Sequence, residues 1–413
     1  MQNHKPVIVS EPDDHEYPEF LLKALHKYYK NRLAQSWKGK HILGTTKPEK
    51  NAIILQSNDY LCLSRHPQLI SRQQNAMARY GNGDMKSLVF QTHNPLLHQC
   101  EIALAEWIQY PSCLVSQSGW CANTGLMQAI ATRGLPVYLD SYAHMSLWEG
   151  VCSARAQAIP FQHNNLCSLE KRLARFGSGI IAVDSIYSTT GTIAPLKEIC
   201  ALAKAYNCIT IVDESHALGI SGLNGRGMVA EKNLSHQVDL ITASLAKTLA
   251  GRGGMIAGRE DIIEMVRYNA FPAIFSTALM PHDLIGFLTS LEIIDKEPWR
   301  AERLIRIARQ FRQQLEQNEI YLCNSQTHIV PLLCGSEQHT IWLRQQLEQQ
   351  GIFGSVFCAP ATPVNKSLIR LSINCEHTQE QLNHIVGILT RLRKNHPGLM
   401  LFQQNAENGL APS

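Results

Sequence analysis

From residue 112 onward, short apolar runs rich in β-branched residues alternate with stretches that have the apolar spacing of helices. This alternation is typical of a mainly parallel sheet covered by its connecting helices. Residues 196–206, for example, repeat apolar side chains at helical spacing. The pattern therefore predicts one large α/β domain. Its expected strands are residues 112–117, 136–140, 156–161, 179–186, 208–214, 240–245 and 255–258.

A different layout follows the last of these runs. Residues 282–319 have helical spacing that is interrupted at Pro298, and strand-like and helix-like segments come after them. These segments predict a smaller α+β domain, with strands at 327–333 and 368–373 and helices at 337–350 and 379–394. The predicted division is an N-terminal segment (1–55) packing with the small domain, a large domain (56–290), a small domain (291–395) and a frayed tail (396–413).

The composition limits the class of protein. Of the 413 residues, 45% are hydrophobic and only 17% are charged, which excludes general disorder. The net charge of +4 comes from 38 Lys and Arg against 34 Asp and Glu, without a basic block. Such a small excess is not typical of a protein that binds nucleic acid by neutralising phosphates. We therefore expect no nucleic-acid partner.

The cysteines and the N-terminus indicate a cytoplasmic protein. The 12 cysteines are scattered without a C-x-x-C pair, which favours reduced thiols over a disulfide framework or a zinc site. The N-terminus turns acidic between Glu11 and Glu16, unlike a signal peptide, and no apolar stretch is long enough to cross a bilayer. We expect no membrane association and no metal site.

Four polar segments follow predicted strands, at the edge where open parallel sheets place their ligands. The first, Ser118-Gly119-Trp120, is a small turn that opens a helix, so its N–H groups could hold a phosphate. On its own, an ordinary turn capped by Ser118 explains this segment better. The second contains His144, which could stack on a flat ring or move a proton, although a lone histidine is more often structural.

The third segment places Asp213 after an apolar strand, with His216 three residues later. A carboxylate there needs a cationic partner, and a protonated pyridine nitrogen and a nearby arginine fit equally well. In the fourth segment, Lys247 follows an apolar strand in surroundings low in charge, where desolvation would lower its pKa. Together, the four segments offer groups that could bind a phosphate, a ring face, a ring nitrogen and an aldehyde. This combination indicates a pyridoxal-phosphate enzyme.

An ordered set of motifs extends this interpretation over residues 55–373. With these motifs the chain resembles the α-oxoamine synthases, which join an amino acid to an acyl-CoA with loss of carbon dioxide. The resemblance implies an α/β fold-type-I transferase with pyridoxal 5'-phosphate as cofactor, a large mostly parallel sheet domain and a smaller C-terminal α+β domain. The motifs are Ser57-Asn-Asp-Tyr-Leu61, Gln117-Ser-Gly-Trp120, Ala143-His-Met-Ser146, Ser185-Ile-Tyr-Ser188, Asp213-Glu-Ser-His216, Ser244-Leu-Ala-Lys247, Phe275-Ser-Thr277 and Ile369-Arg-Leu371.

Carried over residue by residue, the resemblance implies a role for each matching position. Lys247 becomes the Schiff-base lysine, and Asp213 becomes the partner of the pyridine nitrogen. His216 would hydrogen-bond the ring hydroxyl, His144 would stack on the ring, and Ser188 would lie beside the cofactor. The resemblance therefore implies four catalytic residues: Lys247, Asp213, His144 and His216.

The resemblance also implies how phosphate and substrate are held. The Ser118-Gly119-Trp120 turn and Ser244 would bind the cofactor phosphate. Ser276 and Thr277 would assist from the neighbouring subunit of a homodimer with shared active sites. Arg370 would clamp the amino-acid carboxylate, a role that suits a bidentate guanidinium.

Within the family, the chain is most similar to the bacterial α-hydroxyketone autoinducer synthases, through stretches such as Ala143-His-Met-Ser-Leu-Trp-Glu-Gly150 and Gly354-Ser-Val-Phe-Cys358. This similarity implies that a medium- or long-chain acyl-CoA condenses with a small amino acid such as 2-aminobutyrate. The product would be an α-aminoketone precursor of a hydroxyketone quorum-sensing signal.

Three alternatives stay open. The first is another α-oxoamine synthase, of the 8-amino-7-oxononanoate or 2-amino-3-oxobutyrate type. A loop at 83–92 that is bulkier and more apolar than the usual Gly/Ser-rich loop argues against it, because this loop is expected to reshape the substrate pocket. The second is a cofactor-binding protein without turnover, against which the intact Lys247, His144 and Arg370 argue. The third is an α/β domain for another phosphate ligand.

Overall fold

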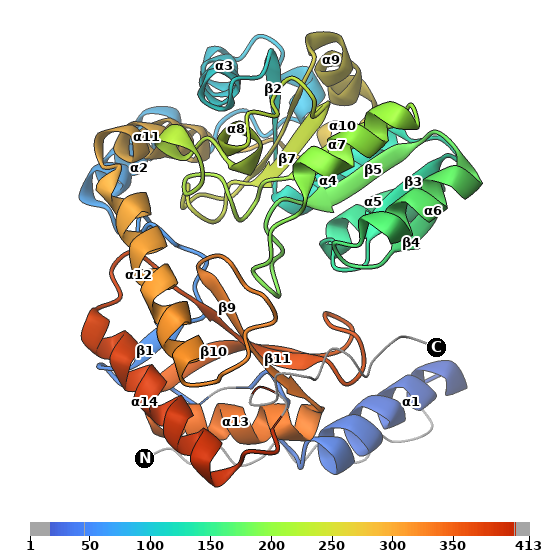
Figure 1. Ribbon diagram of the computed structural model, residues 1–413. Helices are drawn as coiled ribbons and strands as arrows, with labels where there is room; N and C mark the ends of the chain where they lie inside the picture. The colour runs from blue at the N-terminus through green and yellow to red at the C-terminus, as the bar shows by residue number, and fades with distance from the viewer. Residues whose placement is uncertain (1–16, 45, 400, 402–413) are drawn as a thin grey trace.

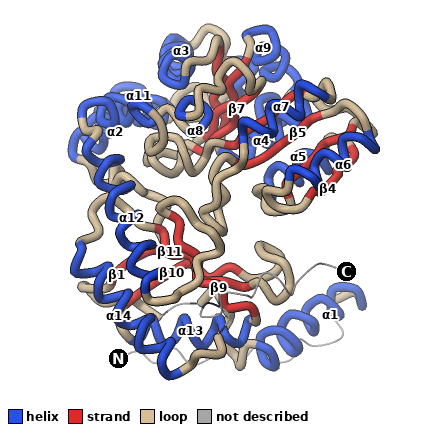
Figure 2. Tube along the Cα trace, in the orientation of Figure 1, coloured by secondary structure: helices blue, strands red, loops and turns tan. Residues whose placement is uncertain are grey.

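The computed structural model describes residues 17–44, 46–399 and 401 (Figure 1). Residues 1–16 of the predicted N-terminal segment, and residues 400 and 402–413 of the predicted tail, lie outside the described residues. Figure 2 shows two groups of strands, each flanked by helices, with the larger group above the smaller one.

The larger group is a seven-stranded sheet with the order β2-β8-β7-β6-β5-β3-β4. Strand β8 runs antiparallel to both of its neighbours, and the other pairings are parallel. The sequence prediction of seven strands in a mainly parallel sheet is therefore confirmed. The strands are β2 (Ser112–Ser116), β3 (Pro136–Asp140), β4 (Gln157–Phe161), β5 (Ile180–Asp184), β6 (Ile209–Asp213), β7 (Leu240–Ser244) and β8 (Gly254–Gly258).

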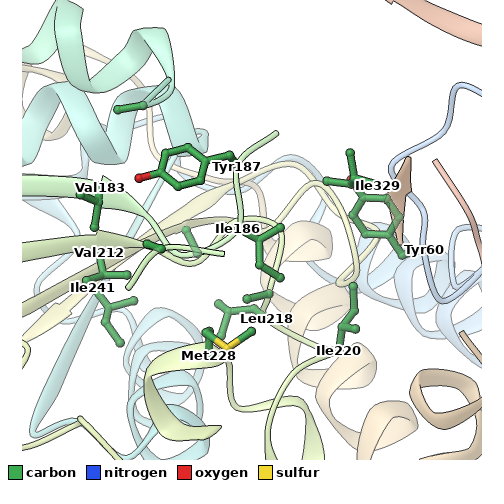
Figure 3. Packing of buried hydrophobic residues seen from close by; sticks show 14 of the residues in the cluster. Tyr60, Val183, Ile186, Tyr187, Val212, Leu218, Ile220, Met228, Ile241 and Ile329 are labelled. Carbon is green, nitrogen blue, oxygen red and sulfur yellow. The ribbon is translucent and has the colours of Figure 1, made fainter. Parts of the chain in front are cut away.

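The central strands are buried almost completely, which explains their continuous apolar sequences. Every residue of β5 is buried, as are all residues of β6 except the first. Figure 3 shows Val183, Val212 and Ile241, from β5, β6 and β7, packed in one apolar layer.

Helices in the connections cover this sheet. They are α2 (Pro67–Tyr80), η2 (Leu88–Phe90), α3 (Pro95–Ile108), α4 (Gly119–Ile130), α5 (Met145–Ser153), α6 (Leu166–Phe176), α7 (Leu196–Ala205), η3 (Leu223–Gly225), α8 (Met228–Glu231), α9 (Glu260–Asn269), α10 (Phe271–Phe275) and α11 (Pro281–Lys296).

The smaller group is a four-stranded sheet with the order β1-β10-β11-β9. Strand β1, which lies far from the others in sequence, pairs in parallel with β10, and the remaining pairs are antiparallel. The predicted helical region does break at Pro298, between α11 and α12. The elements are β1 (Ile53–Leu55), α12 (Trp299–Gln317), β9 (Ile329–Gly335), α13 (Glu337–Gln349), β10 (Ile352–Phe357), β11 (Ser367–Ser372) and α14 (Gln379–Asn395), with α1 (Glu19–His26) and η1 (Lys27–Ser36) before them.

Strands β1 and β10 were not predicted from the sequence. Strand β1 has only three residues, too few to show alternation. Strand β10 contains Gly354, which interrupts the apolar run. A Cβ at this position would lie 2.6 Å from Ile369 Cγ2, so the glycine allows close packing of two neighbouring strands.

Within the described ranges, no helix is long and apolar enough to cross a membrane. In the same residues, no group of three or more His, Cys, Asp and Glu side chains is placed to hold a metal ion.

Strand β8 lies so close to the start of α4 that Gly254 cannot carry a side chain without displacing backbone. A Cβ there would lie 2.2 Å from Ser118 O. We expect Gly254→Ala to lower the melting temperature by about 4 °C or more, the shift that roughly 1–2 kcal/mol produces in a domain of this size. Gly387→Ala in α14 is the matched control, because its Cβ would meet nothing within 4 Å and alanine favours helix. Equal melting temperatures for the two variants would contradict the assigned packing.

Candidate active site

A cavity of about 1030 Å³ lies between the two sheets. Its walls come from loops that follow β3, β5, β6 and β7, from the segment after β1, and from β9, β10 and β11. Such a volume is at the upper end for small-molecule sites. Five of the residues singled out from the sequence line it: His144, Ser188, His216, Lys247 and Arg370.

Parallel strands place their carboxyl ends at one edge of the large sheet, and the polar residues gather there. Strands β5 and β6 end at Asp184 and Asp213, which are paired in register. Strand β7 ends at Ser244, three residues before Lys247. The local sequence therefore brings two buried carboxylates and a lysine to the same edge.

Lys247 has the electrostatic properties of a nucleophilic amine. Burial lowers its pKa from 10.5 to about 8, while Asp213 and Asp184 oppose the shift by favouring the charged form. Near physiological pH, the neutral form that attack on an aldehyde requires is therefore far more populated than in an ordinary lysine.

Asp213 is fixed by hydrogen bonds to both carboxylate oxygens. Its Oδ1 accepts from Ser215 N at 2.8 Å, and its Oδ2 accepts from Asn123 Nδ2 at 2.7 Å. The side chain is only 4% exposed. A carboxylate held in this way can stabilise a cation that enters the cavity, such as a protonated ring nitrogen.

The two histidines are both disfavoured as cations. Partial burial lowers the pKa of His144, and Asp213 opposes this effect. Full burial lowers the pKa of His216 well below its usual value, and the charge of Lys247 adds to the shift. The Tyr60 hydroxyl lies 2.8 Å from His216 Nδ1, which fixes the ring beside the cavity.

Arg370 comes from β11 of the small sheet and reaches the same cavity. Its Nη1 donates to Ser188 O at 2.8 Å and its Nη2 donates to Asn58 Oδ1 at 2.9 Å. Its Nε is buried without a hydrogen-bond partner among the described residues. A guanidinium held by two neutral oxygens keeps its charge uncompensated, so it is suited to a carboxylate ligand.

The turn before α4 forms a second cluster with the end of β7. Ser118 Oγ caps α4 by accepting from Cys121 N at 3.1 Å, which leaves the N–H groups of Gly119 and Trp120 available to a phosphate. A Cβ on Gly119 would lie 2.7 Å from Ser244 Cβ, so the turn and Ser244 are in direct contact. The Trp120 ring is 6.2 Å from that of His144, which connects this cluster to the cavity wall.

Ser276 and Thr277 are not brought to this cavity within one chain. Both are exposed, and Thr277 forms an isolated bridge with Ser87. The loop at 83–92, which was expected to shape the substrate pocket, does not line the cavity of its own chain either. Phe90 of this loop is 73% exposed.

Sequence reasoning assigned no role to several polar residues that complete the site: Asn58, Tyr60, Asn123 and Ser146. Asn123 interrupts the apolar stretch of α4 and is only 1% exposed. A polar residue in an otherwise apolar helical stretch was therefore an available signal. Asn58 and Tyr60 belong to the Ser57-Asn-Asp-Tyr-Leu61 motif, but local sequence does not reveal their roles, because their partners are 312 and 156 residues away in the chain.

Comparisons with known proteins identify the family. A family model described as aminotransferase class I and II matches residues 50–389. The chain is 42% identical to the CAI-1 autoinducer synthase of Vibrio campbellii, over 94% of this chain and 98% of that protein. It is 33% identical to an 8-amino-7-oxononanoate synthase of Xylella fastidiosa, over 82% and 85%. The solved serine palmitoyltransferase of Sphingomonas wittichii superposes with a TM-score of 0.79 at 26% identity, over 84% and 88%.

The chain therefore belongs to the aminotransferase class I and II family and, within it, to the α-oxoamine synthases, which are pyridoxal-phosphate-dependent acyltransferases. The residues present fit that cofactor. Lys247 offers an amine of lowered pKa for the aldehyde, and Asp213 offers an oriented carboxylate for the ring nitrogen. The start of α4, which lies against Ser244, offers N–H groups for the phosphate. The expected fold-type-I architecture is likewise confirmed.

The lowered pKa of Lys247 predicts the pH dependence of cofactor uptake. For the chain stripped of cofactor, we expect the uptake rate of added pyridoxal phosphate to rise with pH around a midpoint near 8, because only the neutral amine reacts. Asp213→Asn should move the midpoint to lower pH, because the Asp213 charge raises the lysine pKa. Stopped-flow absorbance would measure both.

The control for this experiment is Lys366→Met, which removes another lysine of the cavity wall and should leave the midpoint unchanged. A midpoint near the ordinary value of 10.5 would show that Lys247 is not the reacting group.

Proposed function

We propose that this enzyme condenses a medium- or long-chain acyl-CoA with a small amino acid such as 2-aminobutyrate. Carbon dioxide is lost, and the product is an α-aminoketone precursor of an α-hydroxyketone quorum-sensing autoinducer. The observation that carries the proposal is the convergence of Lys247, His144, His216 and Arg370 on one large cavity, with Asp213 behind it. The 42% identity to a CAI-1 autoinducer synthase supports this choice of product class.

In this proposal, Arg370 binds the carboxylate of the amino acid and so fixes its Cα near Lys247. Bound pyridoxal phosphate would accept the electron pair left at that carbon. The Lys247 amine, with a pKa of about 8, removes and returns the proton at Cα. The new bond joins Cα to the acyl carbonyl carbon, CoA leaves as its thiol, and the amino-acid carboxylate leaves as carbon dioxide.

The cavity has room for more than an amino acid. Leu333, Phe357 and Leu368 give it an apolar wall on the side of the small sheet, and Trp148 adds to this from α5. Burial of a methylene group in such surroundings contributes about 0.8 kcal/mol. We therefore assign this wall to the acyl chain. Because the 12 scattered cysteines favour a reducing compartment, we place the reaction in the cytoplasm.

We further propose a homodimer in which Ser276 and Thr277 reach the phosphate of the partner's cofactor. Support comes from the apolar surface around these residues. Phe275 is 78% exposed, Phe271 is 54% exposed and Phe90 is 73% exposed, while the Ser87–Thr277 bridge holds the segments together. Large exposed apolar patches of this kind mark association surfaces.

Product analysis tests the reaction. We expect the holoenzyme, given 2-aminobutyrate and a panel of acyl-CoA thioesters, to release one carbon dioxide per CoA thiol and to prefer medium or long unbranched chains. Arg370→Lys should raise KM for the amino acid by about tenfold, because lysine lacks the bidentate fork. Arg303→Lys, which changes an arginine bonded to backbone carbonyls, should leave KM unchanged.

Two results would contradict the proposed substrates. Turnover restricted to acyl groups that end in a carboxylate would favour the 8-amino-7-oxononanoate type. Cofactor uptake without any thiol release would favour a binding protein without turnover.

The proposed dimer predicts the effect of Phe275→Glu. A buried glutamate in an apolar interface is costly, so we expect this variant to sediment as a monomer and to retain less cofactor. Leu223→Glu is the control, because Leu223 is 77% exposed but lies outside the patch. Wild-type protein that is monomeric at full activity would contradict the shared site.

A further inference from the structure

Asn123 is a buried amide that connects the carboxylate of the site to one of its histidines. It lies on α4 and is 1% exposed. Its Nδ2 donates to Asp213 Oδ2 at 2.7 Å and to Ser146 Oγ at 2.8 Å. Its Oδ1 accepts from Thr242 Oγ1 at 2.5 Å. Because a carboxylate only accepts hydrogen bonds, the charge of Asp213 fixes which way the amide points.

The orientation of Asn123 determines the orientation of the Ser146 hydroxyl. Ser146 is fully buried, and its Oγ already accepts an amide hydrogen. Its own proton can then go only to His144 Nδ1, which lies 2.7 Å away. The opposite arrangement, with a proton on Nδ1, would leave the hydroxyl hydrogen without an acceptor among the described residues, and a buried unmade hydrogen bond is unfavourable.

A second contact also requires an unprotonated Nδ1 on the His144 ring. His144 is the N-cap of α5, and its Nδ1 accepts from Ser146 N at 3.3 Å. Both donors therefore face the same nitrogen. The other nitrogen, Nε2, makes no hydrogen bond to the described part of the chain, while the His144 side chain lines the cavity.

We propose that Asn123 and Ser146 are positioning residues that hold His144 as the neutral tautomer protonated at Nε2, in an orientation set by the charge of Asp213. His144 then presents a hydrogen-bond donor to the cavity, where it binds an oxygen atom of the substrate rather than acting as a base. The identity of that oxygen rests on the proposed function, whereas the tautomer is a property of the chain itself.

Burial favours a neutral His144 ring. It is the largest effect on the His144 pKa and lowers it, whereas Asp213 raises this pKa and Lys247 lowers it. Asp184 Oδ1 accepts from the His144 backbone N–H at 3.1 Å, and within the described residues no hydrogen bond joins Asp184 to the His144 ring. The nearby His216 is itself neutral because burial lowers its pKa. Because burial outweighs the effect of Asp213, the pKa of His144 lies below its usual value.

NMR of isotope-labelled histidine ring nitrogens in the holoenzyme tests the proposal, with the His144 signals assigned by their loss in His144→Gln. In the wild type, we expect an unprotonated Nδ1 and a protonated Nε2. Ser146→Ala removes the hydroxyl, so it should produce a mixture of tautomers. It should also lower kcat and kcat/KM together by about tenfold, as loss of a hydrogen-bond partner that orients a functional histidine does elsewhere.

Two further variants separate positioning from stability. Ser146→Thr keeps the hydroxyl and should restore the wild-type tautomer. Thr210→Val removes a buried hydroxyl from the opposite end of β6, where it bonds Asp239, and should change neither the tautomer nor kcat.

A proton on Nδ1 in the wild type would overturn the proposal, and so would a wild-type tautomer and kcat in Ser146→Ala. Because the NMR measurement does not depend on turnover, its failure is distinguishable from failure of the proposed function. Absence of product with every acyl-CoA would overturn the proposed function and leave the tautomer result standing.

Discussion

A negative charge at the end of a buried strand is the constraint on which this site depends. Asp213 closes β6, a strand whose other residues are almost all buried, and its own side chain is 4% exposed. An isolated carboxylate there would be strongly unfavourable. Hydrogen bonds from Asn123 and from the Ser215 backbone compensate part of that cost and leave the charge able to attract a cation. We propose that the protonated pyridine ring of the cofactor is this cation.

The second requirement is that two distant parts of the chain meet at this edge. The carboxylates end strands of the large sheet and Lys247 follows β7, whereas Arg370 lies on β11 of the small sheet. The contact between Arg370 and Asn58 joins β11 to the segment after β1, and Arg370 also donates to the Ser188 carbonyl in the loop after β5. The groups that we propose for cofactor and substrate therefore come from opposite walls of one cavity, so the distance between them depends on how the two sheets are placed.

The sequence was sufficient where an element or a position depends on local context. The strands of the large sheet follow from continuous apolar runs, and so does the placement of Lys247 and Asp213 at the sheet edge, whereas the roles expected of these two residues came from the family resemblance. It was insufficient where the role depends on a distant partner. The contact of Tyr60 with His216 and that of Asn123 with Asp213 join residues 156 and 90 positions apart, and no periodicity encodes such pairs. Strand β10 was missed because Gly354 is there for packing rather than for strand propensity.

Identifying the lysine that carries the cofactor tests these assignments most directly. Holoenzyme is reduced with borohydride, digested, and mapped by mass spectrometry. We expect the pyridoxyl group to be attached to Lys247 alone, and Lys247→Ala to retain no covalently attached group. Attachment to another lysine such as Lys366, or no attachment in the wild type, would contradict the roles assigned to the residues at this edge of the sheet.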